Sequence, residues 1–247
     1  MTQVLGIDIG GSGIKAALVD TGSGELVGDR QRIPTPTEST PANMASAVNE
    51  LLGEFNYDGP VGCCFPAAIV DGRSRTAANI DDAWLGERVD KTFSDATGLP
   101  FTVLNDADAA AVAEMRLGAG VDLQGLVITV TIGTGIGSGL FHDGRLVPNL
   151  EIGHMPGKDG ESIENYASDR ARKAEELSWD EWGTRLDYFL RKTTRVMTPD
   201  HYILGGGASK KFDRYEQQLT VQTPIHIARF LNNAGIIGAA MAVLDET

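Results

Sequence analysis

Residues 6–20, GIDIGGSGIKAALVD, join two apolar runs through a turn rich in glycine. The run VLGIDI predicts a buried strand, and KAALVD predicts a second strand after the turn. Gly10, Gly11 and Gly13 allow positive φ and a close approach of backbone N–H groups, which an anionic ligand such as phosphate requires. An ordinary glycine hairpin would have the same composition, so both interpretations stay open here.

The remaining segments alternate between apolar strands and amphipathic helices, which predicts an α/β fold. Further strands are predicted in 60–70, 101–106, 125–147 and 201–207, and helices in 44–55, 107–120, 179–197 and 232–243. The segment GLVITVTIGTGIGSGLFHDGRLV has the same strand, glycine turn and strand as residues 3–33. This repetition predicts a duplicated architecture, and two such halves would share a cleft that favours small ligands.

Composition excludes several classes of protein. With 247 residues and 42% hydrophobic content, the chain is predicted to be globular, without a targeting or membrane-spanning segment. The only cysteines, Cys63 and Cys64, are neighbours in a predicted strand and point to opposite faces, which fits a reducing cytoplasm. A net charge of −13 disfavours nucleic acid and anionic membranes as partners.

Basic residues are concentrated in the second half of the chain. They could form a local track for a polyanionic substrate, although solvated helix faces give the same pattern. The residues are Arg170, Arg172, Lys173, Arg185, Arg191, Lys192, Arg195, Lys210 and Lys211.

Standard nucleotide signatures are absent. No G-x-x-x-x-G-K-[ST] occurs, and GTGIGSG at 133–139 departs from G-x-G-x-x-G because Ser138 occupies the sixth position. The glycine-rich and catalytic loops of protein kinases are also missing. A phosphate site would therefore have to be built from glycine turns between strands.

Six motifs in order resemble the sugar kinases of the ROK family, within the actin, hexokinase and Hsp70 superfamily. They are GIDIGGSGIK, LNDADAAAVAE, TIGTGIGSG, EIGH, ILGGG and NNAGIIGAAM, and they cover nearly the whole chain. Within that family, FPAAIVDG, TAANIDDAW and VLNDADAA are most similar to the glucokinases that use polyphosphate, or polyphosphate and ATP.

The resemblance implies two actin-like (ribonuclease H-like) domains with an interdomain cleft. The expected N-terminal domain comprises residues 1–106 plus 235–247, and the C-terminal domain residues 107–234. The implied reaction is phosphorylation of the 6-hydroxyl of D-glucose by polyphosphate, with ATP as a second donor and Mg²⁺ as cofactor.

Asp106 is the catalytic base that the resemblance implies. A carboxylate can accept the proton of a sugar hydroxyl as the phosphoryl group arrives, a contribution of about 10²- to 10⁴-fold. From the residues alone, Asp106 could equally be the N-cap of the following helix.

The resemblance also implies a glucose-binding set. Carboxylate, imidazole and amide groups can bind several hydroxyls at once, which allows specificity for a hexose. The set is Asn79, Asn105, Asp106, Glu151, His154 and Glu164.

The phosphate donor is expected at the glycine turns, with Asp8 holding Mg²⁺ through water and Lys15 near the phosphate path. Phosphoryl transfer depends mainly on positioning and charge neutralisation, which amides, cations and Mg²⁺ supply. The expected donor-binding residues are Asp8, Gly10, Gly11, Ser12, Gly13, Lys15, Gly133, Thr134, Gly135, Gly137, Gly205, Gly206 and Gly207.

Two departures from relatives are informative. Many follow the E-x-G-H histidine with three zinc-binding cysteines, whereas this chain continues MPGKDGESIENYAS, so no zinc site is expected. The chain starts directly on the first phosphate strand, which disfavours the DNA-binding role of repressor relatives.

A homodimer is expected. The alternatives are an ATP-dependent hexose kinase and a non-catalytic sugar sensor.

Overall fold

The computed structural model describes residues 3–77 and 80–245. They belong to two compact units, Met1–Leu117 with Asn233–Thr247, and Gly118–Asn232. The first boundary lies after Leu117 rather than at 106, and the second before Asn233 rather than at 235. The first correction has a physical reason: helix α3 (Asp106–Leu117) packs along α7 (Ala234–Ala242) and so belongs to the first unit.

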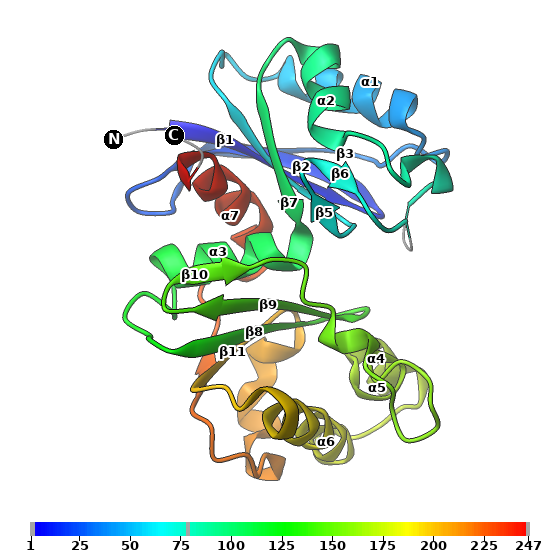
Figure 1. Ribbon diagram of the computed structural model, residues 1–247, viewed down its shortest axis with the longest axis vertical. Coiled ribbons are helices and arrows are strands. Elements are labelled where there is room, and N and C mark those ends of the chain that lie inside the picture. The colour runs from blue at the N-terminus through cyan, green and yellow to red at the C-terminus, as the bar shows by residue number, and fades with distance from the viewer. Residues whose placement is uncertain (1–2, 78–79, 246–247) are drawn as a thin grey trace. The chain divides into compact units, whose positions relative to one another are not determined.

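The first unit contains a five-stranded sheet of order β3-β2-β1-β4-β7 (Figure 1). β1 and β2 are antiparallel and enclose the first glycine turn (residues 10–13), while β4 and β7 extend the sheet in parallel. The strands are β1 (Gln3–Gly10), β2 (Gly13–Asp20), β3 (Leu26–Ile33), β4 (Val61–Phe65) and β7 (Phe101–Asn105), and a small hairpin adds β5 (Ile69–Val70) and β6 (Arg73–Ser74).

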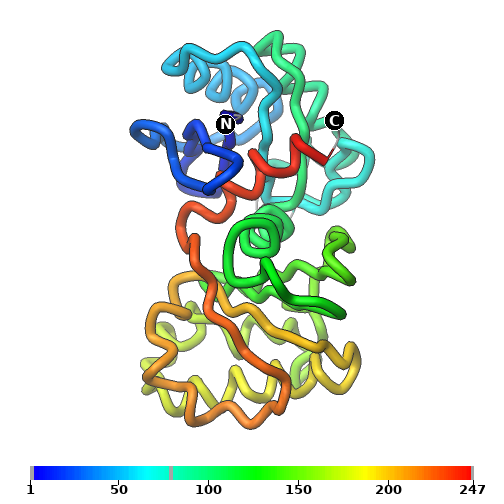
Figure 2. Tube along the Cα trace, turned by 90° about the vertical axis from the view of Figure 1, so that its left-hand side faces the viewer, coloured from blue at the N-terminus to red at the C-terminus, as the bar shows by residue number. Residues whose placement is uncertain are grey.

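Helices cover both faces of this sheet. α1 (Pro41–Leu52) and α2 (Val89–Thr97) bury their apolar sides on one face, and α7 and α3 lie on the other. Figure 2 shows α7, in red, beside the first strands, in blue. The close approach of α7 to β4 and α3 requires glycine. A Cβ at Gly62 would overlap the carbonyl of Ala239, and a Cβ at Gly238 would overlap the carbonyl of Ala109.

The second unit repeats the strand arrangement, with a sheet of order β10-β9-β8-β11-β12. β8 and β9 are antiparallel around the second glycine turn (residues 133–136), and β11 and β12 continue in parallel. The predicted duplication is therefore confirmed at the level of the sheets. The strands are β8 (Leu126–Ile132), β9 (Ile136–His142), β10 (Arg145–Val147), β11 (His201–Gly205) and β12 (Ile225–Ile227).

Helix α6 (Trp179–Met197) supplies much of the core of the second unit. It begins with a capping box in which Ser178 and Glu181 satisfy each other's backbone N–H groups. Trp182 and Phe189 are fully buried on its inner side. The shorter helices are α4 (Glu164–Ala167), α5 (Asp169–Ala174) and single turns at Asp82–Trp84, Ile152–His154, Ala208–Arg214, Glu216–Gln218, Leu231–Asn233 and Val243–Asp245.

Cys63 and Cys64 are both buried and free, and they face opposite sides of the sheet as predicted. Cys63 joins the core beneath α1 and α2, whereas Cys64 packs against Ala109 and Ala239. Across residues 3–77 and 80–245, no helix is both long and apolar enough to cross a membrane.

Candidate active site

The first glycine turn is held by side chains from the strand and loop that follow it. The carbonyl of Gly10 accepts a hydrogen bond from Thr35 Oγ1 at 2.5 Å, and that of Ser12 accepts one from Arg32 Nη2 at 2.9 Å. Gly11 and Ser12 are exposed. The predicted need for positive φ is wrong for the three glycines here, because none has it; Gly13 instead makes room for the Arg32 guanidinium.

Asp8 lies at the end of β1 beside this turn. Its Oδ2 pairs with Lys15 Nζ at 2.8 Å across the β1–β2 ladder. Its Oδ1 accepts a hydrogen bond from the Cys64 thiol at 3.4 Å. Burial raises the pKa of the Cys64 thiol, and the negative charges of Asp8 and Asp106 raise it further. Asp8 and Asp106 therefore both act on Cys64 at one end of the sheet.

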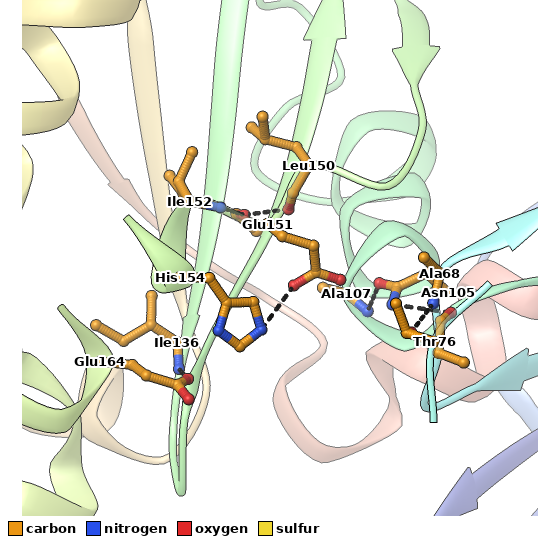
Figure 3. A network of polar contacts seen from close by, with 12 residues as sticks. Ala68, Thr76, Asn105, Ala107, Ile136, Leu150, Glu151, Ile152, His154 and Glu164 are labelled. Carbon is orange, nitrogen blue, oxygen red and sulfur yellow. Dashed lines mark hydrogen bonds and ion pairs between the residues drawn. The ribbon is translucent and has the colours of Figure 1, made fainter. Parts of the chain in front are cut away.

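The junction between β7 and α3 presents Asp106 to solvent. The buried Asn105 caps the helix: its Oδ1 accepts the N–H of Ala107 at 2.8 Å (Figure 3) and the N–H of Asp108 at 3.2 Å. Its Nδ2 donates to the carbonyl of Ala67 at 3.2 Å. Asn105 rather than Asp106 is thus the helix cap. Asp106 is exposed, and its Oδ1 accepts the N–H of Ala107 at 2.8 Å.

In the second unit, Glu151 and His154 flank one short helical turn after β10. Glu151 Oε2 and His154 Nε2 are 3.7 Å apart, and both side chains are exposed (Figure 3). The pKa of Glu151 is raised, chiefly by loss of solvation and further by the nearby Glu164, while His154 opposes the shift. Glu151 therefore lies within the electrostatic influence of both His154 and Glu164, the residues with which the resemblance groups it.

Glu164 also holds the second glycine turn. Its Oε2 accepts the N–H of Ile136 at 3.0 Å and lies 2.5 Å from the place that a Cβ on Gly135 would take. The N–H of Arg170 donates to the carbonyl of Gly133 at 3.2 Å. The start of α4 and α5 thus braces this turn, which contains Thr134 and leads to Gly137 on β9.

The third glycine run follows β11. Gly206 adopts φ of 79°, and a side chain there would strike the backbone of Ile132. Gly205 ends the strand, and the Cα of Gly207 faces open space. Gly206 is therefore required by the left-handed backbone at this corner.

Several of the predicted basic residues are engaged by acidic neighbours. Arg172 and Lys173 both pair with Asp169, at 2.8 and 2.7 Å. Arg185 pairs with Glu175 at 2.5 Å. Arg172 and Lys173 thus share a single carboxylate, which leaves this pair of cations with an excess of positive charge.

Asn79 lies outside the described residues. Within the described part of the chain, no group of three or more His, Cys, Asp or Glu side chains could hold a metal ion. The sequence did not point to Arg32 or Thr35, because their contacts with the first turn depend on strand register, and it pointed to Arg170 for its charge rather than for the backbone N–H that contacts Gly133.

Comparison with known proteins gives a consistent result. A model described as "ROK family" matches residues 4–174. The chain is 40% identical to a polyphosphate glucokinase of Mycobacterium tuberculosis (strain CDC 1551 / Oshkosh), over 98% of this chain and 91% of that protein. It is 42% identical to a polyphosphate glucokinase of Mycobacterium leprae (strain TN), over 96% of this chain and 73% of that protein.

One solved structure agrees over its full length. The inorganic polyphosphate/ATP-glucomannokinase from Arthrobacter sp. strain KM has a TM-score of 0.93 and 42% sequence identity, and the match covers 100% of both chains.

Proposed function

Because the chain belongs to the ROK family, we propose that it transfers a phosphoryl group from inorganic polyphosphate, and also from ATP, to the 6-hydroxyl of D-glucose. The expected fold is confirmed: each unit has the mixed α/β sheet of the actin and hexokinase superfamily. The similar relatives are enzymes, so a non-catalytic sugar sensor is set aside.

The observation that carries this proposal is the exposed carboxylate of Asp106 at the start of α3. Asn105 fixes the helix terminus through three hydrogen bonds, and Asp106 Oδ1 is oriented by the Ala107 N–H. An exposed carboxylate can accept the proton of a hydroxyl that lies within hydrogen-bond reach. We assign to Asp106 the removal of the proton from the sugar hydroxyl during transfer.

Sugar recognition is assigned to the cluster around Glu151. Glu151 and His154 are exposed and can exchange hydrogen bonds with neighbouring hydroxyls. Glu164 contributes the carboxylate oxygen that Ile136 does not engage. Asn105 retains one amide hydrogen for a hydroxyl, and Asn79 completes the proposed set.

Donor binding is assigned to the glycine turns and the Gly205–Gly207 run. Turn amides and Lys15 neutralise phosphate charge, and transfer then depends on positioning. Asp8 suits Mg²⁺: Lys15 and the Cys64 thiol use one lone pair on each oxygen, so a water of the ion can still be bound. When bound, Mg²⁺ would neutralise charge on the donor phosphates.

The names of the relatives support a proposal about which sugars and which phosphate donors this protein uses. The Arthrobacter protein is named a polyphosphate/ATP-glucomannokinase, which favours D-mannose as a second acceptor and ATP as a second donor. We further propose a cytoplasmic homodimer, with the two free, buried cysteines suiting a reducing compartment. Light scattering of the purified protein tests the dimer.

The test measures glucose 6-phosphate formation with polyphosphate and with ATP separately. Activity with ATP alone would favour the ATP-dependent hexose kinase. D106N should lower kcat by about 10²- to 10⁴-fold while glucose binding, followed by calorimetry, is retained. D95N is the matched control, since Asp95 is an exposed helical carboxylate that pairs with Lys91. A D106N variant with near wild-type kcat contradicts the assignment.

A further inference from the structure

Three charged side chains form a row across the first three strands of the first sheet. Asp8 on β1 is directly opposite Lys15 on β2, and Lys15 is directly opposite Arg32 on β3. Residues paired in this way project from the same face of an antiparallel ladder. The row ends beside the first glycine turn, because Arg32 donates to the carbonyl of Ser12.

The row carries an excess of positive charge. Asp8 compensates Lys15 at 2.8 Å, whereas in residues 3–77 and 80–245 no carboxylate forms an ion pair with Arg32. Like charges directly opposite each other on a sheet destabilise it unless something offsets the repulsion. Such an arrangement at a turn with exposed Gly11 and Ser12 suits an anionic ligand.

The guanidinium of Arg32 is also positioned by the turn. Its Nη2 donates to Ser12 at 2.9 Å, and its Nε and Nη2 lie 2.6 and 2.7 Å from the place that a Cβ on Gly13 would take. Glycine at position 13 therefore allows the planar group to lie against the backbone. A guanidinium has five N–H donors, so several remain for oxygens of a phosphate.

We propose that Arg32 is a phosphate-binding residue, which contacts the anionic donor at the first glycine turn together with Lys15. This inference rests on the proposed kinase function and adds a residue that the family motifs do not include. Arg32 and Thr35 together hold the carbonyls of Ser12 and Gly10. These bonds engage the carbonyl oxygens of the turn. The phosphate donor would therefore face cationic side chains and backbone N–H groups.

The experiment compares R32Q with wild type, using tripolyphosphate and ATP as donors. R32Q should raise the KM of both donors about tenfold, since a charge-assisted hydrogen bond to phosphate is lost, and leave the glucose KM within about twofold. R32K, which retains the charge without the planar fork, should lie between. R73Q is the control, because Arg73 is also exposed and donates to a carbonyl, that of Gly86, at 3.0 Å.

A second readout needs no turnover. Tripolyphosphate should raise the melting temperature of wild type and R73Q without glucose, and most of this shift should disappear in R32Q. Were the wild type to phosphorylate no sugar, the kinase function would fail while this measurement still tested Arg32. R32M, of similar length, replaces R32Q if that variant is unstable.

Unchanged donor KM and an unchanged thermal shift in R32Q would overturn the proposal. Equal increases in the KM of donor and glucose would overturn it as well, since they indicate a structural role in the turn.

Discussion

The two glycine turns occupy the same place in their sheets, but the charged side chains that contact them, Arg32 at the first and Glu164 at the second, have opposite signs. At the first, donors from Arg32 and Thr35 hold the carbonyls of the turn. At the second, the carboxylate of Glu164 holds the N–H of Ile136. A repeated strand, turn and strand is therefore compatible with different side-chain roles at the two turns. The first turn carries the positively charged Arg32 beside the proposed donor site, whereas the second carries the carboxylate of Glu164, which we assign to the sugar.

Among the variants that test this comparison of the two turns, we expect the largest effect from E164A. Removing the carboxylate leaves the N–H of Ile136 without its acceptor and removes a proposed sugar contact. We expect kcat/KM for glucose to fall about 100-fold, corresponding to about 2.7 kcal/mol. Initial-rate kinetics at saturating donor measure it. E175A, which removes an exposed carboxylate paired with Arg185, is the control and should stay near wild type.

Alanine substitution of one glycine in each turn, made as two separate variants, should have an intermediate effect on KM. A methyl group at Gly13 displaces Arg32, and one at Gly135 displaces Glu164. G13A should raise the donor KM about tenfold, and G135A should raise the glucose KM by a similar factor, since each loses one charge-assisted contact. Both KM values are measured for both variants. A G135A variant with an unchanged glucose KM would contradict the assignment of Glu164 to the sugar.

The smallest effect concerns pH. An ordinary glutamate side chain has a pKa of about 4.3. Because the pKa of Glu151 is raised, its carboxylate takes up a proton at a higher pH than this. The glucose KM should therefore rise as the pH falls through the range above that value. Glu164 contributes to the raised pKa, so E164Q should shift this dependence to lower pH. A glucose KM that is flat with pH would remove Glu151 from the sugar contacts.

Local patterns were sufficient to predict most elements of the fold. Apolar alternation placed β1 and β2, and helical spacing placed α6 from its buried Trp182 and Phe189. The boundary at Leu117 was missed, because it depends on α3 packing against a helix from the far end of the chain. Contacts between distant segments leave no periodic signal.

In the candidate site, too, local sequence patterns were sufficient for some residues, whereas others depended on the three-dimensional structure. The sequence placed Asp106 at a strand-to-helix junction, and in the structure this residue begins α3 and is exposed. The capping role of Asn105 needed the geometry of its side chain, since Asn and Asp are both common caps. Arg32 required the register of β3, which has an irregularity between Ala16 and Leu18 that sequence alone does not locate.

The glycine-mediated contact of α7 with β4 and α3 has a consequence for biosynthesis. The first strands leave the ribosome early, but the helix that covers one face of their sheet is encoded at residues 234–242. Throughout translation of the second unit, that face lacks α7 and is covered only in part, by α3. The segment made first is therefore completed last, and a nascent chain stopped before Ala234 would present an apolar sheet surface to chaperones.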